Sequence, residues 1–180
     1  DVERSRGLGD VYKRQDAFMP EGITQLAVDS IFMMPQLGVL ANIDKDELKE
    51  DASQAALEVF DNDCLIRLGT CVTPVGNAKP NSKMADVTLT FSDGTVKEIE
   101  INEGSLEMME YPYEEVKVHI KPSRGIDVGA GKGEELESVI YGGVVGLIFD
   151  GRNRPITLSK ESDQRINSCL LYTSDAADEG

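Results

Sequence analysis

The sequence predicts a fold in two parts, an α/β segment followed by a β-rich domain with a sandwich- or barrel-like arrangement. Helical periodicity is confined to the first part, between residues 44 and 68. After residue 70 the period of the apolar side chains falls to two, and short strands alternate with turns rich in glycine and proline. We therefore expect domains at residues 16–69 and 70–160.

The first part is predicted to contain a strand followed by helix. Residues 23–28 are uncharged and form the expected strand, and Met33-Met34-Pro35 is the expected turn from this strand into a helix. Asp44-x-x-Glu47 has the pattern of a capping box and opens a second helix. Helix is expected to continue through residues 64–68 and to end at Gly69. The apolar face of this helix contains Leu48, Ala52, Ala55, Ala56, Val59 and Phe60.

The second part is predicted to be a succession of strands. Val87, Leu89 and Phe91 alternate with threonines, and Asp93-Gly94 is a strong signal for a hairpin turn into a partner strand at residues 95–101. Further strands are expected at residues 116–120, 139–141, 144–149 and 156–158. The run 144–149 is the most apolar in the chain, which favours a strand buried on both faces.

A glycine-dense stretch, R-G-I-D-V-G-A-G-K-G at residues 124–133, precedes this buried strand. It fails the P-loop pattern twice, because Ile126 and Gly133 stand where the first glycine and the hydroxyl residue should be. It also lacks the spacing of a dinucleotide fingerprint. Residues 125–129 resemble the first phosphate loop of actin-like ATPases, but Pro122 and Arg124 interrupt the strand that should precede it. The favoured interpretation is a tight connection whose glycines adopt positive φ.

The two ends of the chain are predicted to be translated adapter DNA. Residues 10–15, D-V-Y-K-R-Q, correspond to the mosaic end of a transposase sequencing adapter, and residues 5–9 continue that adapter upstream. Residues 169–179 match the opposite strand of such an adapter. We therefore expect residues 1–15 to be a disordered artefact, residues 161–180 to be a tail that is mostly artefact, and the chain to be a fragment.

Composition narrows the possible chemistry. The net charge is −15, of which −13 falls on residues 16–168, and such acidity argues against binding nucleic acid through its phosphates. No signal peptide or membrane-spanning run is found, and the expected location is cytoplasmic. Cys64 and Cys71 match no metal motif and are expected to be buried. His119, the single histidine, is expected on the solvent side of a strand, so neither a metal site nor a catalytic triad is predicted.

Three blocks of sequence together resemble one known family. They are V-D-S-I-F-M-M-P-Q-L-G-V-L, D-C-L-I-R-L-G-T-C-V-T-P-V-G, and K-P-S-R-G-I-D-V-G-A-G-K-G through G-G-V-V-G-L-I-F-D-G-R-N-R-P. In this order they are similar to the carboxy-terminal part of the glutamate mutase (methylaspartate mutase) accessory family, called GlmL or MutL. The likeness covers roughly residues 16–158.

This resemblance implies an actin-like (ASKHA) ATPase fold. Residues 16–69 would be the remnant of its second lobe, and residues 70–160 a β-rich appendage. The family's members resemble factors that maintain or reactivate adenosylcobalamin-dependent mutases, whose subunits would be the partners. ATP and Mg²⁺ are expected in the full-length protein. Its phosphate loops lie upstream, so the resemblance implies no catalytic residue and no ATPase activity here.

Two groups of residues are candidates for contact sites. Asp29, Met34, Pro35 and Gly38 are nucleotide-lobe candidates, because their turn would line the cleft of the lobe. Arg124, Asp127, Gly129 and Gly131 are candidates for a contact loop, and an ion pair between Arg124 and Asp127 is an equal alternative. A truncated lobe should also leave apolar side chains exposed between Ile31 and Leu40.

Two other functions remain open at this point. One is a metabolic subunit similar to hydantoinases or oxoprolinases, which share the lobe architecture. The other is a β-rich binding module without nucleotide chemistry. Neither nucleic acid nor a membrane is expected as a partner in any of these cases.

Overall fold

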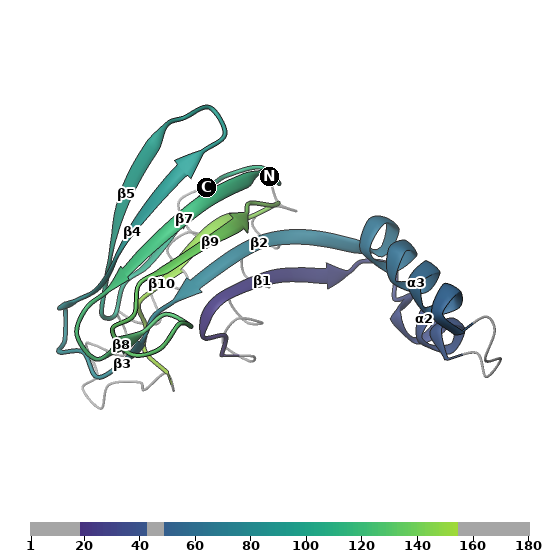
Figure 1. The fold of residues 1–180 in the computed structure, drawn as a ribbon, viewed down its shortest axis with the longest axis horizontal. Coiled ribbons are helices and arrows are strands. Elements are labelled where there is room, and N and C mark those ends of the chain that lie inside the picture. The colour runs from purple at the N-terminus through teal and green to yellow at the C-terminus, as the bar shows by residue number, and fades with distance from the viewer. Residues whose placement is uncertain (1–18, 43–48, 155–180) are drawn as a thin grey trace, which may run out of the picture.

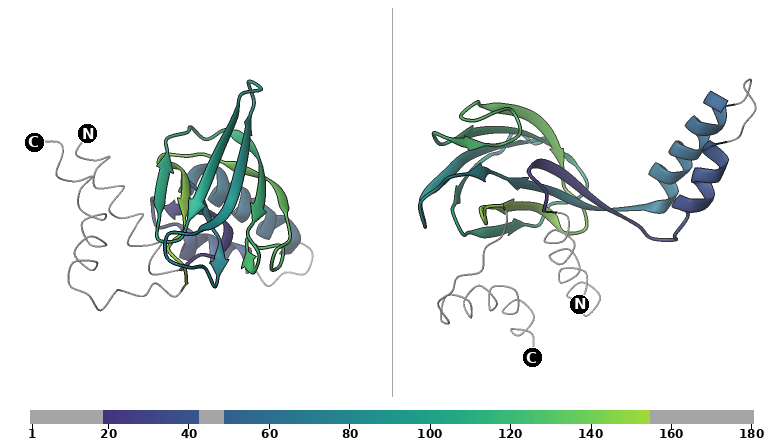
Figure 2. Two further views of the ribbon diagram at one scale, coloured as in Figure 1. Left: turned by 90° about the vertical axis from the view of Figure 1, so that its left-hand side faces the viewer. Right: turned by 90° about the horizontal axis from the view of Figure 1, so that it is seen from below.

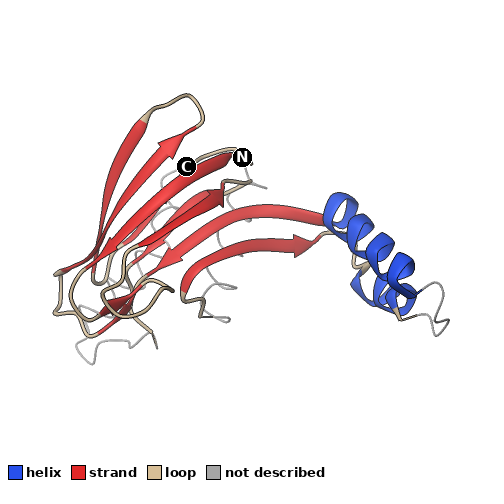
Figure 3. Ribbon diagram, in the orientation of Figure 1, coloured by secondary structure: helices blue, strands red, loops and turns tan. Residues whose placement is uncertain are grey.

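The computed structural model describes residues 19–42 and 49–154. The expected adapter sequences at residues 1–15 and 169–180 lie outside these ranges, as do the capping box at residues 44–47 and the strand expected at residues 156–158. In the described part, strands predominate over helices, which confirms a β-rich fold (Figure 3).

Most of the strands belong to two four-stranded sheets. One has the order β1-β2-β10-β6, and the other has the order β5-β4-β7-β9. In the first sheet β1 and β6 run antiparallel to their neighbours, whereas β2 and β10 run parallel. The strands of the first sheet are Gly22–Asp29 (β1), Leu65–Thr73 (β2), Leu106–Met109 (β6) and Gly146–Asp150 (β10).

The second sheet is antiparallel throughout and contains the predicted hairpin. Its strands are Lys83–Phe91 (β4), Val96–Asn102 (β5), Glu115–Pro122 (β7) and Leu136–Tyr141 (β9). A short pair, Val75–Gly76 (β3) and Ile126–Asp127 (β8), joins the segments that leave β2 and β7. The predicted turn at Asp93-Gly94 connects β4 to β5, and the Asp93 carboxylate accepts a hydrogen bond from the Thr95 amide at 2.8 Å.

The two sheets share one apolar core, as a sandwich does. From the first sheet it takes Val72, Leu147 and Phe149, and from the second the alternate side chains of β4, β5, β7 and β9. A smaller cluster, centred on Cys71 and Ile148, occupies the other face of the first sheet. All five residues of β10 are buried, which confirms a strand buried on both faces. Val144 precedes this strand and is exposed, so the predicted strand began two residues too early.

A two-stranded arm leaves the sandwich and ends in a pair of helices (Figures 1 and 2). β1 and β2 pair along their whole length, but β10 contacts β2 only at residues 69–72. The chain before β10 still bonds to Arg67 and Leu68, and beyond them the ribbon of β1 and β2 continues to the helical tip. We define the helical tip as residues 30–42 and 49–64. The tip contains α2 (Met34–Ala41), α3 (Lys49–Val59) and a π-helical turn (Phe60–Cys64).

The helix predicted through residues 64–68 is wrong. Leu65 opens β2, because residues 65–67 pair with β1 and the ladder continues beyond Gly69. Gly69 lies within this strand and does not end a helix. The domain boundary expected between residues 69 and 70 falls inside β2, which is shared by the arm and the sandwich.

Candidate functional site

The nucleotide-lobe candidates lie where β1 leads into α2. The Asp29 carboxylate accepts hydrogen bonds from the amides of Ile31, Met33 and Met34, at 3.3, 3.2 and 2.9 Å. The bond from the Met34 amide is the main reason why the pKa of Asp29 lies below its ordinary value. Pro35 follows in the first turn and offers no amide. The Asp29 carboxylate therefore occupies the Met34 amide, the first of α2, and the amides of Ile31 and Met33 before it, where a phosphate would otherwise find donors.

Gly38 lies one turn further along α2 and takes no part in the contacts around Asp29. No atom of the described chain comes within 4 Å of the position that a Cβ would occupy there. Within the described residues, Gly38 therefore makes no close packing contact.

The contact-loop candidates lie on both sides of β8, with Arg124 before it, Asp127 at its end, and Gly129 and Gly131 in the tight loop that follows. Gly129 and Gly131 have φ of 109° and 121°, which confirms the prediction that the glycines adopt positive φ. The Asp127 carboxylate accepts hydrogen bonds from their amides at 2.7 and 3.1 Å. Because this carboxylate occupies the loop amides, the loop does not present them to a phosphate. Arg124 is exposed in the preceding turn, and no ion pair joins it to Asp127.

The glycines of G-G-V-V-G mark a point where three backbone segments meet. A Cβ on Gly69 would overlap the carbonyl of Gly146, and a Cβ on Gly146 would overlap the carbonyl of Met109. At Gly143 a Cβ would lie 2.5 Å from the carbonyl carbon of Leu68. The amides of residues 143–145 donate hydrogen bonds to the carbonyl oxygens of residues 111, 67 and 68. These glycines therefore allow β2, the chain after β6 and the chain before β10 to pack backbone against backbone.

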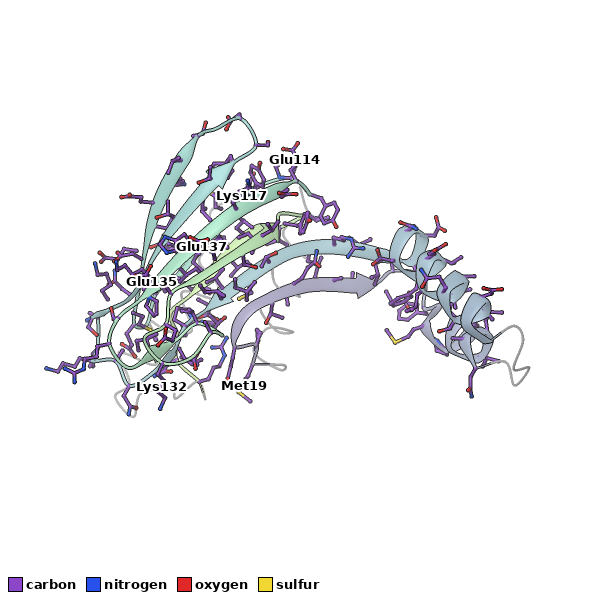
Figure 4. All side chains as sticks on the ribbon, viewed as in Figure 1. Met19, Glu114, Lys117, Lys132, Glu135 and Glu137 are labelled. Carbon is purple, nitrogen blue, oxygen red and sulfur yellow. The ribbon has the colours of Figure 1, made fainter. Side chains whose placement is uncertain are left out.

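A shallow pocket of about 630 Å³ opens beside this junction. Its walls come from the π-helical turn, β2, the loop before β7 and the loop before β10. In Figure 4 the label Glu114 marks the end of the sandwich that lies nearest the arm, one residue beyond the Tyr113 that lines the pocket. The lining residues are Asp61, Asn62, Leu65, Arg67, Tyr113, Gly143 and Val144.

Stacked side chains support one wall of the pocket. The Arg67 guanidinium forms an ion pair with Asp61 and lies 5.3 Å from the centre of the Tyr113 ring. Tyr113 in turn stacks on Tyr141, with ring centres 5.5 Å apart. The sequence predictions did not include Arg67, Tyr113 or Val144. The available signals were an arginine in the otherwise apolar run C-L-I-R-L and the aromatic pair of Y-P-Y-E-E.

A second polar cluster is structural. Asp150 is fully buried, and its Oδ2 accepts hydrogen bonds from Nη2 of Arg152 and of Arg154, each at 2.8 Å. Burial raises the pKa of Asp150, but the hydrogen bonds and charges of Arg152 and Arg154 outweigh it, so the pKa lies below its ordinary value. Asn153 accepts a hydrogen bond from the Gly76 amide at 3.2 Å. The cluster therefore fixes the chain that leaves β10 to Gly76 of β3.

His119 and the two cysteines were the other residues that the sequence singled out. His119 is partly exposed on β7, with its Nε2 2.8 Å from Oε2 of Glu135, which confirms its predicted place on the solvent side. Cys64 and Cys71 are both buried, as predicted. Among the described residues no group of three histidine, cysteine or carboxylate side chains could hold a metal. No helix there is long and apolar enough to cross a membrane.

Three comparisons with known proteins found no match to this chain. Neither the models of protein families, nor the curated proteins, nor the solved structures contain a match to this chain.

Proposed function

We propose that this chain is the carboxy-terminal part of an accessory ATPase of the glutamate mutase accessory family. The whole protein maintains or reactivates an adenosylcobalamin-dependent mutase, whose subunits are its partners. The proposal is supported by the three sequence blocks. In the described fold the second block corresponds to the end of the π-helical turn together with β2 and β3, and the third leads into β10, which pairs directly with β2.

The observation that carries the proposal is the exposed apolar surface of the helical tip. Gln36 is the one polar side chain of α2, a composition typical of a helix buried on all sides. Yet only Leu37 of α2 is buried, against Ala56 and Cys64. The expected exposure of apolar side chains between residues 31 and 40 is confirmed, with Phe32 79% and Val39 74% exposed. Such a surface suits an element whose packing partner is another part of an ATPase lobe.

The same proposal assigns the nucleotide to the upstream part of the protein. Asp29 occupies the amides at the start of α2, and Asp127 occupies those of the glycine loop. Both arrangements disfavour a phosphate at these two places, because an anion would meet a carboxylate. ATP and Mg²⁺ are therefore bound by residues that precede this sequence, and the arm connects that lobe to the β-rich part.

The test uses the longer protein, obtained by extending the reading frame upstream in the source DNA. It should hydrolyse ATP, and with ATP it should restore activity to a glutamate mutase whose cofactor has been replaced by cyanocobalamin. This chain alone should do neither. A longer protein that hydrolyses a cyclic amide and leaves the mutase inactive would contradict the proposal, and so would one that ignores ATP.

A substitution in the tip tests the proposed lobe contact separately. Phe32→Ser should change the free energy of unfolding of this chain by less than about 0.5 kcal/mol, because the side chain is exposed. In the longer protein, where Phe32 would be covered, the same change should lower it by about 3 kcal/mol. Val96→Ser, at an exposed position of β5, is the matched control and should be neutral in both proteins. Equal effects of Phe32→Ser in the two proteins would exclude a covered tip.

A further inference from the structure

The pocket at the root of the arm has an apolar surface that is open to solvent. Val144 is 65% and Tyr113 51% exposed, and Leu65 of β2 lies beside them in the same pocket. Tyrosine and arginine are over-represented among the residues that dominate binding energy in protein interfaces, particularly in pockets that receive a partner's side chain.

Contacts within the chain also hold the side chains and the backbone of the pocket. Arg67 is held by Asp61 and Tyr113 by Tyr141, as described above. The backbone around Val144 is fixed by hydrogen bonds from its own amide to the Arg67 carbonyl at 3.0 Å and from the next amide to the Leu68 carbonyl at 2.8 Å. A preformed surface loses little conformational entropy on binding, which favours affinity.

Charge defines what this pocket can accept. The segments that build it, residues 60–67, 111–115 and 142–145, contain four carboxylates and a single cationic side chain, Arg67. Arg67 is already paired with Asp61. The remaining carboxylates, Asp63, Glu114 and Glu115, are exposed. Asp63 directly follows the lining residue Asn62, and Glu114 and Glu115 directly follow the lining residue Tyr113. We call these three carboxylates the acidic rim. They attract cations, and they disfavour nucleic acid and a second copy of this chain, whose net charge is −15.

We propose that this pocket is a docking site for a partner protein that presents a short basic segment with an apolar anchor. The anchor packs on Val144, Leu65 and Tyr113, and the flanking lysines or arginines face the acidic rim. The site goes beyond the proposed ATPase function and does not depend on it, since all of its residues belong to this chain.

Synthetic peptides test the chemistry directly with this chain. A fluorescein-labelled peptide KKLFKK should bind, as measured by fluorescence anisotropy, and EELFEE and KKSSKK should each bind at least about tenfold more weakly. Raising the salt concentration from about 0.01 M to about 1 M shortens the Debye length from about 30 Å to about 3 Å and should weaken the binding of KKLFKK. Equal binding of all three peptides, or no binding of KKLFKK, would overturn the proposal.

Matched variants then locate the site. Val144→Ser should weaken the binding of KKLFKK by about tenfold, because one valine contact is lost, whereas Val96→Ser should not. Glu114→Lys should weaken binding more than Glu98→Lys, which changes the net charge equally but lies on β5, outside the pocket. All four positions are exposed, so the variants should fold. Equal effects within either pair would show that the peptide binds elsewhere.

Discussion

Gly69→Ala should be among the most destabilising single changes in this protein. Gly69 lies in the middle of β2 with φ of 142°, a region that residues with a Cβ rarely adopt. A Cβ there would come within 3.0 Å of both the carbonyl oxygen and the carbonyl carbon of Gly146. Both atoms belong to a backbone that is fixed on its other side, because a Cβ on Gly146 would itself overlap the Met109 carbonyl. No flexible side chain is available to move away.

Two effects add to give the expected magnitude. Forcing extra volume into a packed site costs about 1–3 kcal/mol. The unfavourable φ adds about 1–2 kcal/mol for a residue with a Cβ. The free energy of unfolding should therefore fall by about 3–5 kcal/mol, which is a large part of the roughly 5–15 kcal/mol of a typical domain.

Urea denaturation followed by far-ultraviolet circular dichroism measures this change. Two alanine substitutions separate the two contributions. Gly94→Ala has a φ of 83° but open space around the added methyl group, so it should cost only about 1–2 kcal/mol. Gly38→Ala, in a helix and also in open space, should stabilise by about 0.5–1 kcal/mol.

The relative order of these three variants is the decisive result. If Gly69→Ala were no more destabilising than Gly94→Ala, the close approach of β2 to the chain before β10 would not exist in the folded protein. The explanation of G-G-V-V-G as a backbone junction would then fail.

Three further substitutions or reactions test other parts of the fold. Asp150→Asn should lower the free energy of unfolding by about 3–5 kcal/mol, because it leaves the Arg152 and Arg154 guanidinium groups buried without their carboxylate. Folding lowers the pKa of Asp150, so its contribution to the free energy of unfolding is complete above its unfolded pKa of about 3.9 and is lost as the pH falls below that value. An acid denaturation curve that Asp150→Asn leaves unchanged would contradict this. Burial raises the pKa of Cys71 to about 12, so a thiol reagent at pH ~8.5 should modify this cysteine only after the protein unfolds. If peptide mapping found Cys71 labelled within seconds in the folded protein, Cys71 would not be buried. His119→Asn should change stability by less than about 1 kcal/mol, since its partner Glu135 is half exposed; thermal denaturation showing a larger loss would place His119 in the core.

The sandwich was largely predictable because its signals are local. The alternation of Val87, Leu89 and Phe91 and the turn at Asp93-Gly94 specify the β4–β5 hairpin without reference to the rest of the chain. The position of His119 followed from the same period of two. The start of α2 was also predicted, because Pro35 suits the first turn of a helix.

Residues 65–68 were assigned to the wrong element because their sequence is ambiguous. A short apolar run after a helix can continue the helix or form a strand, and periodicity does not distinguish the two. The strand is favoured by β1, which lies some forty residues earlier in the sequence and offers an unpaired edge. Local propensity was therefore overridden by a long-range ladder of hydrogen bonds.

For the candidate site residues, too, the sequence indicated local positions and only the fold showed the contacts. The sequence indicated that Asp29 and Asp127 occupy turns, but only the fold shows that their carboxylates bond to the amides that a phosphate would need. The pocket could not be predicted, because its lining residues come from three segments that lie far apart in the sequence, residues 60–67, 111–115 and 142–145.

The sequence by itself predicted β1, β4, β5, β7, β9 and β10, the hairpin between β4 and β5, the buried run of β10 and the positive φ of the loop glycines. These follow from side-chain period and from the absence of a Cβ, which are properties of neighbouring residues. The tertiary structure alone decided which strands pair, why Gly69 and Gly146 must be glycines, and which side chains meet in the pocket. The physical reason is that these depend on contacts between residues far apart in sequence, whose positions are set by packing and not by local preference.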